Sequence, residues 1–398
     1  MAVLTDSEVA RATRTLSAGT FKEKLALLRE LPVCPPSDAG MSEQTPQVAL
    51  KSPYAVDNRA KKFLSKKKLS RDKDCIAFVK FKAVPAGYPE EGSLTFSIKY
   101  ASDLRDDASR QGWVPIWFLP WESGFMWKVK LKSVRQHPTI TLDADATPVN
   151  RDDPTQGTRP VHGTAAVANP GLFFTAAING CSVFARGEPA EPRLYHGGVD
   201  ETELQALITQ IGQQTWNNLG GTAEELWRRL FEGLTDDGAG GLRQKTAAEH
   251  KSRAMKIGGG KVTGEVNKTH YIKETGKEGT QLARHLDHFL RHNSKEVRAE
   301  GVRPWGCVFG LRDDRGQWEF HLQNNATVTY YTLQKRSFLG IPQKPKEVGI
   351  TGRVKDLDTD EWSVKTWPKK HSVFLGCRQF YPHAVPLAKI PFDSLRFF

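Results

Sequence analysis

Apolar and polar positions change their spacing several times along this chain. Residues 5–31 carry apolar side chains at helical spacing, and Pro32 ends that pattern. The alternation typical of strands begins at Cys75 and is clearest over residues 93–100 and 127–134. The first part of the chain therefore predicts a helical stretch followed by many strands.

A helical pattern returns in the middle of the chain. Asp200 is placed to cap a helix that ends near Asn218, and Thr222 with Glu225 forms a capping box that opens a second helix. Strand patterns resume at residue 307 and continue towards the C-terminus. We therefore expect an α+β fold, with a largely antiparallel β-sheet or sandwich core and flanking helices.

Composition divides the chain into two parts. Residues 32–55 are rich in Pro, Ser, Gln and Asp, as linkers often are, and eight Lys and Arg residues fall within residues 59–73. We expect residues 1–73 to form an N-terminal helix, a linker and a basic segment. Residues 74–398 are expected to form the main α+β region, with a possible further boundary near residues 235–262.

The most informative local pattern runs from Cys181 to His196. Strand-forming residues flank a turn centred near Pro189 and Ala190, which predicts a β-hairpin. Folding about that centre brings Cys181 opposite residues 197–198, and a bulge or an asymmetric loop would then place His196 beside it. A thiol and an imidazole in reach of each other can share a proton and yield a thiolate nucleophile. The alternative is a buried cysteine that serves only packing.

Residues beside Cys181 favour the catalytic interpretation. Gly180 allows backbone conformations that other residues avoid, as a sharp turn before a nucleophile often requires. Backbone N–H groups near Cys181 and Ser182, aided by the Asn179 amide, are candidates to stabilise an oxyanion. Asn179 is equally suited to a turn, because Asn-Gly is a strong turn signal.

The run Gly180-Cys181-Ser182, a short strand and then His196 resembles the catalytic domain of the cytotoxic necrotizing factor family. These are bacterial toxins that deamidate a glutamine of host proteins, and Burkholderia lethal factor is similar in arrangement. The resemblance implies that Cys181 is the nucleophile and His196 its base. It also implies that a backbone carbonyl or a polar side chain orients the histidine, and that a β-sandwich carries the site.

By this resemblance the chain is expected to be a protein glutamine deamidase that serves as a bacterial effector or toxin in virulence. Its partner would be a glutamine side chain of a target protein. The first residues lack the charged-then-apolar pattern of a signal peptide. We therefore expect a protein made in the bacterial cytoplasm, secreted without a cleaved signal peptide, and active in the cytosol of a target cell.

Cysteines and histidines indicate no metal site and no cofactor. The five cysteines are scattered singly without a CxxC pair, which favours neither zinc nor a disulfide framework and suits a reducing compartment. His285, His288 and His292 share one face of an expected helix, but a polar helix face is the favoured interpretation. No run of eighteen apolar residues is present, so no transmembrane helix is expected.

Charge and aromatic residues leave other functions open. The formal net charge of +12 attracts anionic partners, and the basic segment is expected to contact an anionic surface or a secretion apparatus. A cysteine protease or a transglutaminase would use the same two residues. A non-catalytic nucleic-acid-binding or interaction protein would use the basic segment and the aromatic residues between 113 and 127, although nucleic acid is not the expected partner.

Overall fold

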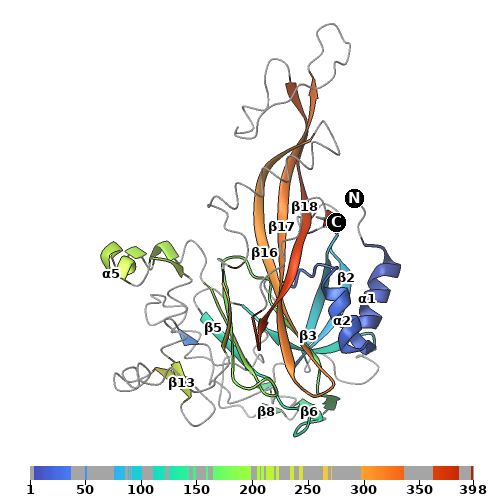
Figure 1. The fold of residues 1–398 in the computed structure, drawn as a ribbon, viewed down its shortest axis with the longest axis vertical. Helices are drawn as coiled ribbons and strands as arrows, with labels where there is room; N and C mark the ends of the chain where they lie inside the picture. The colour runs from blue at the N-terminus through green and yellow to red at the C-terminus, as the bar shows by residue number, and fades with distance from the viewer. Residues whose placement is uncertain are drawn as a thin grey trace.

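Two β-sheets and a pair of N-terminal helices make up most of the described molecule (Figure 1). The computed structural model describes the following residues: 4–36, 50–51, 76–85, 88, 90, 92–100, 111–121, 125–142, 147–148, 158–159, 165–198, 204–206, 208–209, 212–218, 221–223, 234–236, 242–244, 263–267, 270, 297–335, 362–384 and 396–397.

The larger sheet, here called sheet A, has the strand order β19-β18-β17-β16-β10-β4-β2-β3. Its strands are β2 (Ile76–Ala83), β3 (Leu94–Tyr100), β4 (Val114–Leu119), β10 (Leu172–Thr175), β16 (Val297–Arg312), β17 (Trp318–Lys335), β18 (Trp362–Tyr381) and β19 (Arg396–Phe397). Strands β4 and β10 run parallel, and the other described neighbours in this sheet run antiparallel. The carboxyl ends of β4 and β10 therefore lie at the same edge of sheet A.

The smaller sheet, sheet B, has the order β1-β5-β12-β11-β15 and is antiparallel throughout its described pairs. Its strands are β1 (Leu50–Lys51), β5 (Phe125–Lys130), β11 (Ser182–Arg186), β12 (Arg193–Gly198) and β15 (Thr263–Val266). Three short strand pairs complete the described sheets: β6 (Thr139–Leu142) with β9 (Ala165–Ala168), β7 (Thr147–Pro148) with β8 (Thr158–Arg159), and β13 (Leu234–Asp236) with β14 (Leu242–Gln244).

The N-terminal helical pattern forms two helices, α1 (Asp6–Ala18) and α2 (Phe21–Leu28). Each begins with a capping box, in which a threonine side chain accepts from the backbone N–H of a glutamate three residues later. Gly19 separates them, and its N–H bonds the Thr15 carbonyl at 2.8 Å. Of the helix expected from Asp200, residues 204–206 and 208–209 are helical, and α5 (Gln213–Asn218) follows after Gly212, whose φ is +81°. Most of the helix expected from Thr222 lies outside the described residues.

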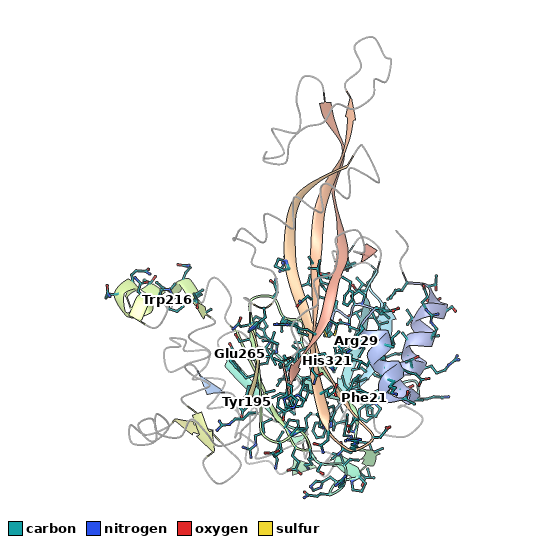
Figure 2. The ribbon with its side chains drawn as sticks, viewed as in Figure 1. Phe21, Arg29, Tyr195, Trp216, Glu265 and His321 are labelled. Atoms are coloured by element: carbon teal, nitrogen blue, oxygen red, sulfur yellow. The ribbon has the colours of Figure 1, made fainter. Side chains whose placement is uncertain are left out.

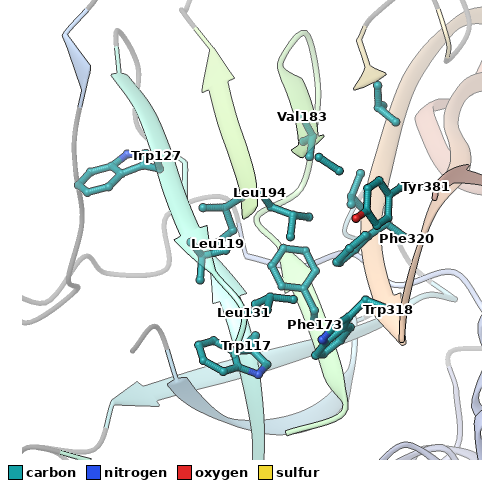
Figure 3. Packing of buried hydrophobic residues seen from close by; sticks show 14 of the residues in the cluster. Trp117, Leu119, Trp127, Leu131, Phe173, Val183, Leu194, Trp318, Phe320 and Tyr381 are labelled. Carbon is teal, nitrogen blue, oxygen red and sulfur yellow. The ribbon is translucent and has the colours of Figure 1, made fainter. Parts of the chain in front are cut away.

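The two faces of sheet A carry different cores. One hydrophobic cluster lies between the two sheets and joins Trp117, Phe173 and Phe320 of sheet A to Val183 and Leu194 of sheet B (Figure 3). We call it the intersheet core. The second cluster lies on the opposite face of sheet A, where buried side chains of α1 and α2 pack on β2, β3, β4, β10 and β16. The layers are therefore helices, sheet A and sheet B in that order.

Figure 2 shows the same order through labelled side chains. Phe21 and Arg29 lie on the helical side, Tyr195 and Glu265 lie on sheet B, and His321 of β17 lies between them. Strands β16, β17 and β18 continue well beyond both cores as a twisted ribbon of three strands (Figure 1). The expected α+β fold with a mainly antiparallel sheet is confirmed.

The two helices share their core with the strands. Leu16 and Leu28 are buried in the cluster that contains Phe96 and Phe309 of sheet A. The helices before the expected boundary at residue 73 and the strands after it therefore pack together as one unit. The sequence pattern could not show this, because it does not reveal which face of a later sheet a helix will cover. The basic segment of residues 59–73 lies outside the described residues.

Candidate active site

The candidate site begins where β4 and β10 leave sheet A together. Thr175 pairs with Leu119 at the end of the parallel ladder, and the Ala176 N–H donates to the Leu119 carbonyl at 2.9 Å. Beyond this point the segment after β4 continues as Pro120 and Trp121, while the segment after β10 continues towards Cys181. Parallel pairing thus brings two segments that lie far apart in the sequence to one edge of the sheet.

The chain from β10 reaches Cys181 through a sharp turn. Ile178 exchanges backbone hydrogen bonds with Gly306 of β16, at 2.9 and 2.8 Å, which fixes the start of the turn. Gly180 then adopts a φ of +94°, in the left-handed region that favours glycine. This is the backbone freedom that the sequence analysis expected of Gly180.

Asn179 is exposed and contacts β16. With its amide oriented to satisfy both partners, its side-chain oxygen accepts two hydrogen bonds from the Arg303 guanidinium, at 2.6 and 2.9 Å. This oxygen is therefore engaged by Arg303 across the turn. Its interaction holds the segment before Cys181 against β16.

Strands β11 and β12 form the expected hairpin in regular register. Ser182 pairs with Gly197 and Val183 pairs with His196, with no shift along the ladder. Continuing this register places Cys181 opposite Gly198, as expected, and a Cβ added to Gly198 would lie 2.8 Å from the Cys181 sulfur. The expected bulge or asymmetric loop is absent from this ladder, so the expectation that His196 lies directly beside Cys181 is wrong and His196 pairs with Val183.

Regular register puts the cysteine and the histidine on the same face of sheet B. Val183 lies in the intersheet core, and paired residues in an antiparallel ladder project to the same side. His196 therefore faces the intersheet core with Val183, and Cys181, also in that core, is its diagonal neighbour. Ser182 alternates to the opposite face, where it is fully buried and its hydroxyl has no hydrogen-bond partner.

The loop of the hairpin is fixed between the two sheets. Gly187 opens the turn with a φ of +101°, and the Tyr381 hydroxyl donates to its carbonyl at 2.8 Å. The backbone N–H of Trp318 donates to the Pro189 carbonyl, also at 2.8 Å. These bonds from β17 and β18 hold the far end of the hairpin, so the register at Cys181 is anchored at both ends.

His196 is fully buried, with Val183 on one side and Trp127 of β5 on the other. Burial lowers the pKa of its imidazole to about 3, while the backbone carbonyls of Leu119 and Pro120 act in the opposite direction. Neither carbonyl makes a well-aligned hydrogen bond, and both ring nitrogens lack a partner within hydrogen-bonding geometry. The imidazole is consequently neutral at physiological pH, and burial makes it a weaker base than a free histidine.

Cys181 is buried as well, with 5% of its surface exposed. Burial raises the pKa of its thiol to about 12, and a hydrogen bond from the Asn179 backbone lowers it in part. A hydrogen bond that lowers a thiol pKa is one donated to the sulfur. Both groups are neutral in this arrangement, in contrast to the preformed thiolate that the sequence analysis expected.

Trp121 lies beside Gly198 and Cys181, and the sequence did not single it out for the site. Its Cδ1 would lie 3.1 Å from a Cβ on Gly198, and its indole nitrogen would lie closer still. The side chain is partly exposed, but the indole N–H is buried and has no hydrogen-bond partner. Gly198 is the residue that makes this packing possible, since any larger side chain would meet both the indole and the sulfur.

The other aromatic residues of this region pack in the core. Trp117 and Trp127 are buried between the sheets, Phe118 is buried on the helical side, and the Trp117 N–H donates to Asn169 at 3.3 Å. This confirms packing, rather than a stacking platform for nucleic acid, as the role of these three residues. Phe125 lies in β5, and its side chain is outside the described part.

The remaining candidates lie elsewhere or outside the described residues. Cys307 is buried and Cys34 and Cys377 are partly buried on the helical side of sheet A, where burial raises the pKa of each thiol. His285, His288 and His292 lie outside the described part of the chain. Among the described residues no group of three His, Cys, Asp or Glu side chains is placed to hold a metal ion, and no described helix is long and apolar enough to span a membrane.

No protein-family model matches this sequence, and no curated protein matches it.

Proposed function

We propose that this chain is a cysteine-dependent amidohydrolase that acts on a carboxamide, most concretely the side chain of a protein glutamine. The observation that carries the proposal is the hairpin register, which puts Cys181 and His196 on one face of sheet B as diagonal neighbours. The carbonyls of Leu119 and Pro120 lie near the imidazole, and the proposal requires a ring N–H to bond one of them so that the histidine is oriented.

In this mechanism the thiol begins neutral. As the Cys181 sulfur attacks the carboxamide carbon, His196 takes the thiol proton and the carbonyl electron pair moves to oxygen. The carbon–nitrogen bond then breaks, and His196 gives its proton to the departing ammonia. Water adds to the thioester and releases a glutamate side chain, which restores the thiol.

The resemblance to deamidase toxins supports glutamine as the substrate and extends the proposal to the biological setting. In that setting the chain is a bacterial effector that modifies a protein of a target cell. A buried sulfur suits a slender side chain better than a folded backbone. A carboxamide on a flexible side chain fits this requirement.

Ammonia release from glutamine-containing peptides tests the proposal. The wild-type chain should convert internal glutamine to glutamate, detected by an ammonia assay and by the mass of the product peptide. Cys181→Ser and His196→Gln should each lower the rate by a factor of about 100 or more, because they remove the nucleophile and the base. Cys377→Ser, at a thiol on the other side of sheet A, should keep the wild-type rate.

The same assay separates the rival chemistries. Cleavage of the peptide backbone that depends on Cys181 would identify a protease. Ammonia release with incorporation of an added amine in place of water would identify a transglutaminase. Wild-type turnover by a folded Cys181→Ser variant would remove the cysteine from the mechanism and contradict the proposal.

A further inference from the structure

One face of sheet A continues beyond the intersheet core as an exposed surface. Along β2 the residues of this face are Ile76, Phe78, Lys80 and Lys82, because alternate residues of a strand project to the same side. Ile76 and Phe78 are buried in the intersheet core, whereas Lys80 and Lys82 are exposed. The core on this face of β2 therefore ends at Phe78, and a charged surface begins.

The neighbouring strands add a third lysine and an indole to this surface. Lys99 of β3 pairs with Phe78 and therefore projects to the same side, where it is exposed. Trp113, just before β4, packs against the intersheet core and is partly exposed. The Lys99 Nζ lies 5.1 Å from the centroid of this ring, within the range of a cation–π interaction. We call Lys80, Lys82, Lys99 and Trp113 the lysine face.

The positive charge of the lysine face is not neutralised by neighbouring side chains. Lys80 pairs with Ser97 and Lys82 pairs with Thr95, so the side chains opposite them on β3 carry hydroxyl groups and no carboxylate. None of the described residues forms an ion pair with any of the three lysines. Unpaired cations on one face, in a chain of formal net charge +12, fit an anionic partner.

We propose that the lysine face binds single-stranded nucleic acid. This binding is independent of Cys181 and goes beyond the hydrolase function. Lys80 and Lys82 lie about 7 Å apart along β2, so each can contact a different phosphate of an extended strand. Lys99 has a long, exposed side chain, and when its ammonium group turns to a phosphate the Trp113 ring becomes free to stack on a base.

The indole favours nucleic acid over other anionic partners. An acidic peptide or an anionic membrane would be attracted by the lysines alone. Proteins that bind single strands combine cations that follow the backbone with aromatic rings on which bases stack. The lysine face offers both on an open sheet surface. Trp113 thereby differs from Trp117 and Trp127, which are buried between the sheets.

Fluorescence anisotropy with a labelled oligothymidylate of about 16 nucleotides tests the proposal on the intact chain. Lys80→Gln, Lys82→Gln and Lys99→Gln combined should reduce the steepness of log association constant against log salt by about 2, because each lost phosphate contact removes about 0.7. At about 0.1 M salt this corresponds to roughly 100-fold weaker binding. Trp113→Leu should weaken binding about 10-fold without changing the slope, because it removes stacking and no charge.

Arg11→Gln, Arg14→Gln and Lys22→Gln combined is the matched control. These exposed cations belong to α1 and α2, on the opposite side of sheet A, and their removal changes the net charge by the same amount. The affinity and the slope should remain close to those of the wild type. All variants retain the basic segment of residues 59–73, so any binding by that segment is common to them. Circular dichroism and urea unfolding check that each variant is folded.

Equal weakening by the two triple variants would show that total charge, and not the lysine face, governs binding, and would overturn the proposal. A wild-type chain that binds no oligothymidylate at about 50 mM salt would overturn it as well. So would a lysine-face triple variant that loses binding to polyglutamate or to phosphatidylserine vesicles and keeps binding to the oligonucleotide.

Photocrosslinking locates the stacked base directly. An oligonucleotide in which iodouracil replaces thymine should crosslink to Trp113 on irradiation, as mapped by mass spectrometry of the digested wild-type chain. Crosslinks confined to other residues would contradict stacking on Trp113 and overturn the proposal.

Discussion

His196 combines a basic nitrogen with complete burial, and this combination decides how the residue acts. Burial keeps both the imidazole and the Cys181 thiol neutral, so the proposed mechanism has His196 take the thiol proton during attack and does not use a permanent ion pair. Gly198 serves the same site by its small size, since it lets Trp121 approach the sulfur. At the scale of single residues, two absences define the site: water is excluded from the His196 imidazole, and Gly198 has no side chain.

Burial of His196 makes the stability of the chain depend on pH. The folded pKa of about 3 lies below the ordinary value of 6.5, so below pH 6.5 the unfolded chain binds a proton that the folded chain excludes. The stability from this residue is present above pH 6.5 and is lost as the pH falls towards 3. At about pH 5 the loss is on the order of 2 kcal/mol.

Urea unfolding of wild type and His196→Gln at about pH 7.5 and about pH 5 measures this effect. The wild type should lose more stability on acidification than the variant. His137→Gln, at an exposed histidine, should behave as wild type. An acid sensitivity that is equal in wild type and His196→Gln would show that His196 is not held neutral by burial.

At the scale of elements, β4 and β10 carry much of the site, and only part of this follows from the sequence. The hairpin is readable because Gly187, Pro189 and Pro192 interrupt two strand patterns. The sequence also reveals Gly180 as a residue for a special conformation. Nothing local indicates that β4 pairs in parallel with β10, and so the carbonyls of Leu119 and Pro120 and the Trp121 indole could not be assigned to the site.

The end of helix α2 allows a test of how the N-terminal helices are attached to sheet A. Gln323 of β17 is fully buried, and its amide accepts from the Val33 N–H at 2.9 Å and donates to the carbonyls of Leu28 and Leu31 at 2.6 and 2.9 Å. These bonds satisfy the end of α2 and the chain that leaves it. A side chain from the sheet thereby completes the helix.

Gln323→Leu should cost roughly 3 kcal/mol of unfolding free energy, because it leaves several buried backbone groups without partners. Gln379→Leu, at a partly buried glutamine of β18 with one longer bond of 3.3 Å, should cost much less. Chemical denaturation measures both values, and hydrogen exchange should show faster exchange in α1 and α2 of Gln323→Leu. An unchanged stability and unchanged exchange would mean that these bonds do not attach the helices.

At the scale of the whole molecule, the site lies at the edge of the intersheet core, on the face of sheet A opposite the helices. The α+β composition could be predicted from alternating patterns and the N-terminal helices from spacing and capping residues. The layer order could not, since strands β2, β4, β10 and β16 are buried on both faces and their sequences do not say which face meets the helices.

The proposed function requires above all that Cys181 reacts with a carboxamide-like group through His196. A glutamine peptide in which a diazoketone replaces the carboxamide measures this directly, by peptide mapping of all five cysteines in the intact chain. The account predicts an adduct on Cys181 alone, formed about 100-fold more slowly or not at all in His196→Ala. A folded wild-type chain without an adduct on Cys181, or labelling that does not depend on His196, would contradict it.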